Sequence, residues 1–296
     1  MMKTTGRSIS HDSNSLLIIP YELLLLVGDL LDIASVFSIK IVCKKIWTMF
    51  GTLDLDLDLD RYDIIDNIIS NRYTGLFKWL HPNRNSMSPN LKQQYCDMAA
   101  SSGSLEIVKY LCERGCEWNQ WACNEAAKNG HLEILKYLVP KFDVTHEWNA
   151  WPSIYYAIRY GNLDILIWMY ENDYLIDTDS CARAAEFGQL HILKWLRTKD
   201  FDWDINAYRY AARAGHLEIL RYLRSVDGNK YCGNPSISNY AASQGRLEIL
   251  KWLHENGYRW NAQTMKEAVS NDHSDVVKYL HENRCPCMIE YCSYCT

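Results

Sequence analysis

The sequence predicts an all-α fold, an α-solenoid of stacked helix-turn-helix units preceded by a small helical module. Three observations support this prediction: a nine-residue motif recurs along the chain, its copies are almost evenly spaced, and the apolar residues inside each copy have a helical period. The clearest copies are Gly103–Leu111, Gly130–Leu138, Gly215–Leu223 and Gly245–Leu253, with looser ones from Gly161, Gly188 and Asp272 and a worn one from Arg72 to Leu80.

The composition restricts the class of protein. With 296 residues and a net charge of −5, the chain lacks the basic face that is typical of nucleic-acid binders. Its eleven cysteines are an odd number scattered singly through the repeats, which favours reduced thiols over a secreted disulfide framework. We therefore expect a cytoplasmic protein with no nucleic-acid partner.

The N-terminal region shows no secretion signal and no membrane span. Its first residues are polar, and residues 1–14 are expected to form a disordered leader. The most apolar run, Leu16–Val36, is interrupted by Pro20, Glu22 and two aspartates. Charges at mid-membrane depth cost about 2.5 to 3.5 kcal/mol each on insertion scales, so no contact with a membrane is expected.

Residues 15–50 are predicted to form a compact group of short helices. Pro20 suits a first helical turn, where its missing N–H costs nothing. Apolar residues then recur at helical spacing through Leu30 and Leu31, and after a short turn Val36–Phe50 is predicted to be a further helix. One interpretation is a helical cap that shields the first repeat.

The same residues resemble the F-box. The match consists of Ile19–Leu24, then Leu30, Leu31, Asp32 and Ser35, then Val42–Lys45, in the order and spacing of that family. It departs at Ile19, where Leu is usual, and at Ile46, where the family generally has Trp. The resemblance implies docking on the Skp1 adaptor of a cullin-based ubiquitin ligase. The apolar contacts it implies are Pro20, Leu23, Leu24, Leu30, Leu31 and Val42.

Residues 51–64 are predicted to be an acidic linker. Leu53–Asp60 alternates Leu and Asp, which formally matches a strand. However, Asp is depleted from strands, and four like charges repel one another. The segment also lacks the glycine turn and the bidentate Glu of an EF-hand calcium loop.

Residues 65–284 are predicted to hold about eight units, each counted from a glycine-type anchor. The first helix of a unit has about nine residues and ends at the anchor, where Gly, or Asn and Asp in the last unit, accepts a left-handed backbone. The anchors are Arg72, Gly103, Gly130, Gly161, Gly188, Gly215, Gly245 and Asp272. The predicted N-caps are Asn119, Asp177, Asp204, Asn234 and Asn261. Small pairs that allow close approach are Ala99–Ala100, Ala126–Ala127, Ala184–Ala185, Ala211–Ala212 and Ala241–Ala242.

The second helix of each unit is apolar at positions 2, 4, 5, 7 and 8 after the anchor. Helices this short are marginal alone in water, so each is expected to bury its apolar face against the neighbouring units. An acid at position 3 and a base at position 6 mark the solvent side, each pair contributing only about 0.2–0.5 kcal/mol. The predicted pairs are Glu106/Lys109, Glu133/Lys136, Glu218/Arg221, Glu248/Lys251 and Asp275/Lys278.

These units resemble ankyrin repeats over about residues 65–290. Ala126–Leu138 is close to the helix-turn-helix core of that family, but no unit has its Thr-Pro-Leu-His start. The commonest spacing is 27 residues, whereas the family's is 33. The missing residues fall where ankyrin repeats carry a β-hairpin, so we expect short loops without hairpins. Trp118, Trp203 and Trp260 share one loop position, which predicts an aromatic ring packed between units.

Two further sets of repeated side chains are predicted to be structural. His131, His216 and His273 follow an anchor, where the ankyrin resemblance implies a His that forms local hydrogen bonds, and no spacing lets them meet at a metal. The aromatics at position 7 could form a base-stacking stripe, but no basic groove accompanies them, so core packing is favoured. They are Tyr110, Tyr137, Trp168, Trp195, Tyr222, Trp252 and Tyr279.

The last twelve residues, 285–296, form a Cys-rich tail. Cys285, Cys287, Cys292 and Cys295 lie within eleven residues, and four thiolates can hold zinc. Cys285, however, shares the loop position of Cys116 in an ordinary repeat, and a zinc knot usually needs a longer span between ligand pairs. We expect no metal here, with zinc as the alternative.

The two resemblances together imply a substrate receptor in which the F-box binds a Skp1-like adaptor and the repeats bind a protein target. No phosphate loop, Ser/His/Asp set or separated carboxylate pair is present, so neither an enzyme nor a cofactor is expected. Trp121 and Trp151 are candidate target contacts, because Trp is enriched at binding hot spots. The alternative is an ankyrin-like scaffold without a ligase link, whose N-terminal helices serve as a cap.

The same combination of an F-box with short, Trp-rich units also resembles proteins of large DNA viruses that infect amoebae. That resemblance implies that the adaptor would be the host's and that the chain acts in the host cytoplasm. Outside the ligase complex a monomer is expected.

Overall fold

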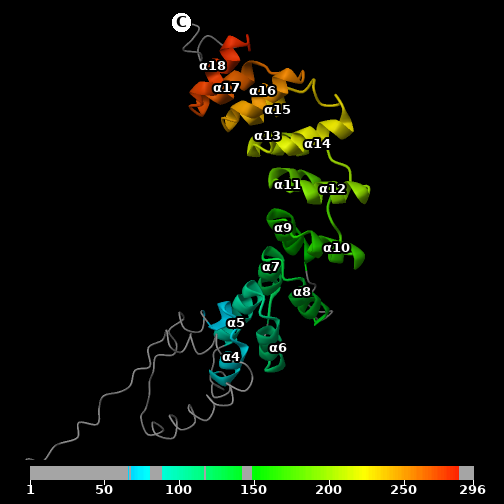
Figure 1. Ribbon diagram of the computed structural model, residues 1–296, viewed down its shortest axis with the longest axis vertical. Helices are drawn as coiled ribbons and strands as arrows, with labels where there is room; N and C mark the ends of the chain where they lie inside the picture. Colours follow the sequence, from blue (N-terminus) through cyan, green and yellow to red (C-terminus); the bar gives the residue numbers. More distant parts are fainter. Residues whose placement is uncertain (1–65, 67, 81–88, 117, 142–148, 287–296) are drawn as a thin grey trace, which may run out of the picture. The chain divides into compact units, whose positions relative to one another are not determined.

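The computed structural model describes residues 66, 68–80, 89–116, 118–141 and 149–286. These residues are helices joined by turns, and no strand occurs among them (Figure 1). None of the helices found in these ranges has both the length and the apolar character that a membrane span requires. The chain divides into two compact units, Met1–Asn85 and Ser86–Thr296.

The described residues of the first unit contain one anchor and its helix. Residues 68–70 are helical, Arg72 has a left-handed backbone with φ +59°, and α4 (Thr74–Leu80) follows. Ile68, Ile69 and Phe77 are buried. The worn copy of the motif therefore has the predicted form.

The second unit contains seven helix pairs, within its described residues, that stack in chain order (Figure 1). The first helices are α5 (Pro89–Ser102), α7 (Gln120–Lys128), α9 (Ala150–Tyr160), α11 (Ser180–Glu186), α13 (Ile205–Ala214), α15 (Ser236–Ser243) and α17 (Ala262–Ser270). The second helices are α6 (Leu105–Glu113), α8 (Leu132–Leu138), α10 (Leu163–Glu171), α12 (Leu190–Thr198), α14 (Leu217–Asp227), α16 (Leu247–Glu255) and α18 (Ser274–Glu282), with a 3₁₀ turn η1 (Val139–Lys141) after α8.

The first helices form one layer and the second helices form the other. Each first helix packs closely on the next, whereas the second helices pack mainly on their own partners. The five predicted alanine pairs are completely buried in the first layer. Because alanine has no side chain beyond Cβ, these helices can approach one another closely, as the sequence predicts.

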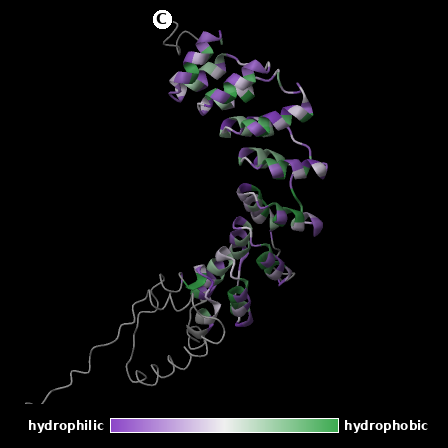
Figure 2. Cartoon of the chain, viewed as in Figure 1, coloured by the Kyte–Doolittle hydropathy of each residue, from purple (hydrophilic) through white to green (hydrophobic). Residues whose placement is uncertain are grey.

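The second helices supply most of the larger core side chains. Figure 2 shows their hydrophobic residues on one side and hydrophilic residues on the other. Positions 4, 5 and 8 after the anchor are buried in all seven pairs, as Ile219, Leu220 and Leu223 illustrate. The aromatics at position 7 are half-buried, so they are less buried than the prediction of core packing implies. They lie at the edge, where a large ring can remain partly in water.

All eight predicted anchors have a positive φ, including Arg72 and Asp272. A second left-handed position, twelve residues after the anchor, ends several second helices. It is occupied by Gly115, Asp173, Asp200, Gly257 and Arg284. Sequence analysis missed this position because only two of these five residues are glycine.

The predicted N-caps are confirmed at Asn119, Asp204 and Asn261, whose side chains accept a backbone N–H from their own helix. Asn234 also accepts the N–H of Ser236, although Pro235 is the residue next to α15. The prediction is wrong at Asp177, because α11 begins three residues later. Its carboxylate instead accepts hydrogen bonds from the Trp151 indole at 2.9 Å and the Ser180 hydroxyl at 2.6 Å.

The described loops between units are turns without a β-hairpin, in agreement with the short spacing. Rings in these loops pack on the position-7 aromatic of the following unit, as predicted, with centroid separations of 6.0 Å for Trp203 and Tyr222 and 6.2 Å for Trp260 and Tyr279. The loop ring is thus one of the contacts that join a second helix to the next, beside direct ones such as that between Tyr170 and Trp195.

Candidate functional site

The outer side of the second helices carries an ion pair in four of the seven units. Four of the five predicted pairs form, with Nζ or guanidinium to carboxylate distances of 2.7–2.9 Å. The fifth is wrong: Lys278 lies 4.0 Å from Glu282 rather than pairing with Asp275. These exposed pairs contribute little stability, and other charges on these helices, such as Asp164 and Lys194, form no ion pair among the described residues.

A ladder of hydrogen bonds joins consecutive first helices. From Gly130 onward, the side chain that follows each anchor donates to a backbone carbonyl near the end of the preceding first helix. His131, His216 and His273 donate through Nε2 to Ser101, Glu186 and Ser243 at 3.0, 3.0 and 3.3 Å. Asn162, Gln189 and Arg246 make the equivalent contact to Ala127 and Lys128, to Arg159 and to Arg213.

These histidines therefore have the structural role that the sequence predicts, with one correction. Their bonds are not local, because each reaches about 30 residues back into the preceding unit. The carbonyls they reach are end groups that a helix leaves without an internal partner. The ladder ties neighbouring units together and is unlike a metal site.

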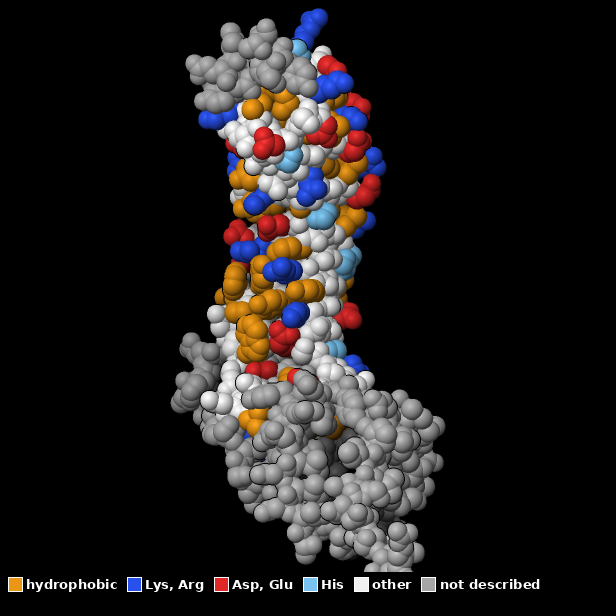
Figure 3. Space-filling model, turned by 90° about the vertical axis from the view of Figure 1, so that its left-hand side faces the viewer, with side chains coloured by type: hydrophobic (Ala, Val, Ile, Leu, Met, Phe, Trp, Pro, Cys, Tyr) orange, Lys and Arg blue, Asp and Glu red, His pale blue; other side chains and the backbone are white. Residues whose placement is uncertain are grey.

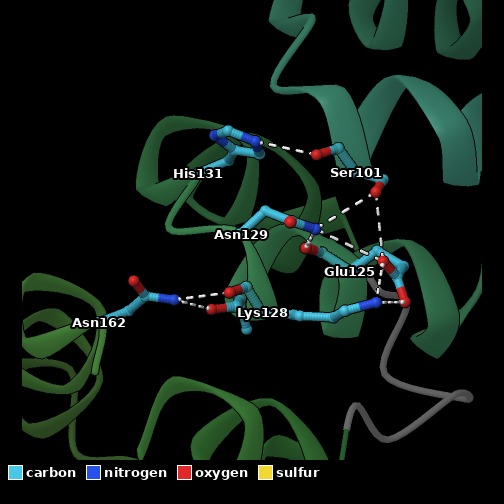
Figure 4. A network of polar contacts seen from close by, with 7 residues as sticks. Ser101, Glu125, Lys128, Asn129, His131 and Asn162 are labelled. Atoms are coloured by element: carbon cyan, nitrogen blue, oxygen red, sulfur yellow. Dashed lines mark hydrogen bonds and ion pairs between the residues drawn. The ribbon is translucent and has the colours of Figure 1, made fainter. Parts of the chain in front are cut away.

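The exposed side of the first layer, which we call the first-helix face, differs from one unit to the next. On α7 it is a closed polar network (Figure 4). Glu125 accepts from Lys128 at 3.1 Å and from Ser101 at 3.2 Å, while Asn129 donates to Ser101 at 3.2 Å. Polar groups that satisfy one another in this way have little to offer a partner.

On α9 and α11 the same face carries a group of rings, two exposed and three half-buried, which we call the aromatic patch: Trp151, Tyr155, Tyr156, Tyr160 and Phe187. Trp151 stacks on Tyr155 with centroids 5.8 Å apart, and Phe187 meets Tyr155 edge-on at 5.6 Å. Tyr160 is 47 % exposed and Trp151 44 %. Figure 3 shows hydrophobic side chains gathered midway along this side of the stack, with basic side chains among them.

Two arginines lie on these rings. The Arg183 guanidinium carbon is 5.4 Å from the ring centroids of both Trp151 and Tyr155. That of Arg159 is 5.4 Å from Phe187 and 5.7 Å from Tyr160. Neither arginine forms an ion pair with a described carboxylate. The aromatic patch is therefore both apolar and cationic.

The two tryptophans predicted as target contacts occupy the same place in consecutive first helices. Trp121 and Trp151 are each the second residue of their helix, and each backbone N–H is bound by the capping Asn two residues earlier. Trp121 is 50 % exposed. Trp151 belongs to the aromatic patch, whereas no ring contact joins Trp121 to it among the described contacts. Exposure fits the predicted role but does not test it.

Sequence analysis missed the rest of the patch. Tyr156 and Arg183 stand five residues before their anchors, Arg159 two before and Tyr160 one before. One residue before the anchor the other units carry Ser, Asn, Ala or Gln, so the rings of Tyr160 and Phe187 depart from the repeat, whereas five before the anchor Tyr210 and Tyr240 carry rings as well. A comparison of exposed positions between units would have found the patch.

The cysteines of the described chain are free thiols. Burial raises the pKa of Cys123 and of Cys181 to about 12 and that of Cys116 to about 11. Cys112 differs: a hydrogen bond from Cys96, which outweighs burial, lowers its pKa. Cys285 is buried like Cys116 and donates to the carbonyl of Asn261 at 3.4 Å.

The remaining predicted site residues lie outside the described ranges. They are Pro20, Leu23, Leu24, Leu30, Leu31 and Val42 of the F-box-like module, and Cys287, Cys292 and Cys295 of the tail. Among the described residues no group of His, Cys, Asp and Glu has the arrangement of a metal site. The adaptor contacts and the zinc alternative therefore stay predictions.

Comparisons with known proteins agree with the repeat architecture. The family model described as ankyrin repeats (3 copies) matches residues 97–180 and 182–264, which is more than half of the chain. No curated protein matches. Among solved structures, the crystal structure of the human ASB11 ankyrin repeat domain is similar, with 18 % identity over 55 % of this chain and 83 % of that chain and a TM-score of 0.43.

Proposed function

Since the chain belongs to the ankyrin repeat family, whose repeats bind protein partners, we propose that its first-helix face holds a target protein for a cullin-based ubiquitin ligase. The observation that carries target binding is the aromatic patch. Residues 15–50 would supply the link to the ligase by docking on a Skp1-type adaptor. The chain would then be a substrate-recruiting subunit without catalytic residues of its own, acting in the cytoplasm.

Target binding on the first-helix face is supported by the grouping of rings on α9 and α11. On α7 the polar side chains satisfy one another and Trp121 is the one exposed large hydrophobic residue, whereas α9 and α11 bring Trp151 and Tyr160 together with half-buried rings. Rings of this size are common at the centre of protein interfaces, where their burial contributes most of the binding energy. The second-helix side also exposes apolar residues, namely Tyr170, Leu175 and Val226, but four exposed ion pairs lie along it.

The link to a ligase is supported by the F-box resemblance alone. The apolar residues that this resemblance assigns to the adaptor are Pro20, Leu23, Leu24, Leu30, Leu31 and Val42. The second candidate function is an ankyrin scaffold with no ligase link, in which these residues only cap the repeats. In a scaffold of this kind the aromatic patch would still bind the target protein. The two candidate functions therefore differ only in whether residues 15–50 bind Skp1.

Co-purification of Skp1 with the full chain separates the two candidates. We expect the natural chain to retain Skp1 and the Pro20→Ala, Leu24→Ala double variant to lose it. Leu175→Ala is the control, because Leu175 is 89 % exposed in the repeats and its loss should not change the yield of Skp1. Absence of Skp1 from the natural chain, or equal yields from all three chains, would favour the scaffold.

A further inference from the structure

We propose that the partner of the aromatic patch is an acidic, extended segment of the target protein. Its carboxylates would pair with Arg159 and Arg183, and its apolar side chains would pack on the exposed rings. The inference rests on the proposed function, because it names the chemistry of the target at that same face. It does not depend on whether residues 15–50 bind Skp1.

The arginines of the patch have no counterion among the described residues, unlike the bases of the four ion pairs on the second helices. On the second helices, Lys109, Lys136, Arg221 and Lys251 each reach a carboxylate within 3 Å. Arg159, Arg183 and Arg213, on the first-helix face of α9, α11 and α13, form no ion pair with a described residue. A carboxylate from outside the chain would supply the missing partner.

The environment of Arg183 makes this pairing stronger than an ordinary surface contact. Its guanidinium lies on the rings of Trp151 and Tyr155, and its Nε is buried without a hydrogen-bond acceptor. Arg159 is restrained similarly, since Nη1 donates to the Tyr155 hydroxyl at 3.4 Å. Rings exclude water from a cation and hold it in place, so a carboxylate that arrives there meets a partly desolvated and ordered partner.

The acidic residues on the same face do not serve as counterions of these arginines. Asp177 is engaged by Trp151 and Ser180. Asp204 caps α13 by accepting from Asn206 at 2.8 Å. Glu186 holds in α11 the position that Arg159 and Arg213 hold in their helices, and it forms no ion pair with either. These acids remain charged and reduce the positive field between α9 and α13, but none of them pairs directly with Arg159 or Arg183 among the described residues, so a carboxylate of the partner can still take that contact.

The extent of the face indicates a short segment. Packed helices lie about 8–10 Å apart, so the span from α9 to α13 is about 20 Å. An extended chain rises about 3.3 Å per residue, which corresponds to about six residues. Two helices beyond α13, on α17, the face is polar: the Glu267 carboxylate accepts from Gln263 at 2.6 Å and the Glu267 carbonyl from Asn271 at 2.8 Å.

A polyanion such as RNA is a poorer fit than an acidic peptide. Nucleic-acid binders present many basic residues along the phosphate path, whereas this face has three unpaired arginines and the chain has a net charge of −5. A short peptide needs only two or three carboxylates, and its side chains can use the rings that a phosphate backbone would leave uncovered.

Selection from a displayed library of random twelve-residue peptides, with the full chain as bait, tests the inference. The same library is selected against the Arg159→Gln, Arg183→Gln variant. We expect peptides enriched on the natural chain to carry an excess of Asp and Glu together with Leu or aromatic residues, and this excess to disappear on the variant. Circular dichroism melts of both chains show that the variant is folded.

One enriched peptide is then synthesised with a fluorophore and its affinity measured by anisotropy. Arg183→Gln and Arg213→Gln should each weaken binding about fivefold or more, since a cation at an interface contributes on that order. Arg221→Gln, on the second-helix side, is the matched control and should change the affinity less than about twofold. Arg213 touches none of the patch rings, so its effect cannot come from a disturbed patch.

Three results would overturn the inference. Enriched peptides without an acidic excess would leave the patch as a target site with a different chemistry, so the proposed function would survive. Tighter binding of a twelve-nucleotide single-stranded RNA than of any selected peptide would make the face a nucleic-acid site. No enrichment on the natural chain would overturn both the inference and target binding at this face, while the Skp1 measurement would still report on the N-terminal module.

Discussion

The Nε2–H of His216 donates to the backbone carbonyl of Glu186, thirty residues earlier, at 3.0 Å. The same ring explains why the anchor of the preceding unit is glycine. A Cβ placed on Gly188, whose φ is +78°, would stand 2.8 Å from the His216 ring. The anchor thus serves two purposes: it ends α11 with a left-handed residue, and it leaves room for the side chain that joins the next unit.

Gly188→Ala is expected to lower the free energy of unfolding by about 2 kcal/mol. About 1 kcal/mol comes from the left-handed backbone, and about 1 kcal/mol from displacing His216 and its hydrogen bond. Gly115→Ala is the matched control: Gly115 has φ +72°, but nothing lies within 4 Å of an added Cβ. It should cost about 1 kcal/mol. Urea denaturation followed by circular dichroism measures both.

The double variant Gly188→Ala, His216→Ala tests whether the two effects share one cause. Since the alanine at 188 already displaces the ring, removing the ring should add little, and the two costs should be less than additive. Full additivity would mean that the His216 ring moves aside without losing its contact. The same reasoning applies to Gly245 and His273, where the separation would be 2.6 Å.

Asp227→Ala is expected to destabilise the chain by about 2–3 kcal/mol. Its carboxylate accepts from the Trp203 indole at 2.7 Å and from the Tyr208 hydroxyl at 3.2 Å, and both donors belong to buried side chains. Donors left without an acceptor cost about 1–3 kcal/mol each when buried. Asp275→Ala, at an exposed position without an ion pair to Lys278, should change the unfolding free energy by less than about 1 kcal/mol. Equal effects of the two substitutions would contradict the role of Asp227.

The repeat architecture could be predicted because its sequence motif recurs several times in one chain. Each anchor, alanine pair and apolar triplet is seen in several copies, so an irregular unit is recognised from the regular ones. Arg72 and Asp272 illustrate this: neither is glycine, and both are left-handed at the predicted positions. The loop rings Trp203 and Trp260 could be predicted for the same reason.

What differs between units could not be predicted in the same way. The aromatic patch depends on which exposed positions of α9 and α11 lie beside one another, and this is decided by how the helices stack. Asp177 shows the same limit at a cap: its carboxylate is used by Trp151, 26 residues away in the chain. Asp is a favourable N-cap residue by local sequence, but here its carboxylate binds a side chain of another unit instead of the N-terminus of its own helix.

The Asp97 carboxyl on α5 gives a pH dependence whose sign is opposite to that of an ion-paired aspartate. Burial, with a smaller contribution from Glu125, raises its pKa from 3.8 to about 6, and its Oδ1 is buried without a partner. The folded chain therefore holds this proton more tightly than the unfolded chain does. Stability from this group is lost as pH rises from about 4 to about 6, and above that range the loss is complete.

Asp97→Asn should remove this dependence, because an amide does not titrate. We expect the variant to be more stable than the natural chain at pH 7, with the difference shrinking as the pH falls toward 4. Thermal melts of both chains at half-unit steps measure the difference, and taking it cancels the effect of the other carboxylates. A difference that is constant between pH 4 and pH 7 would show that Asp97 titrates normally in the folded chain.

The cysteines of the described repeats should react with iodoacetamide in two groups, because the thiolate is the reactive form and must also be reached by the reagent. Cys112 is half-buried and its pKa is lowered by the Cys96 thiol, so it should be alkylated first at pH 7.5. Cys116, Cys123 and Cys181 are buried with raised pKa values and should react only when the chain unfolds. Peptide mass spectrometry over time, without and with urea, gives the order.

Cys96→Ser tests the cause of the fast alkylation of Cys112. A serine hydroxyl can still donate to the Cys112 thiolate, so the alkylation rate should stay similar, whereas Cys96→Ala should lower that rate. Alkylation of Cys123 or Cys181 as fast as Cys112 in the native chain would mean that the stack of α5 to α12 opens readily, which its continuous alanine-lined layer opposes.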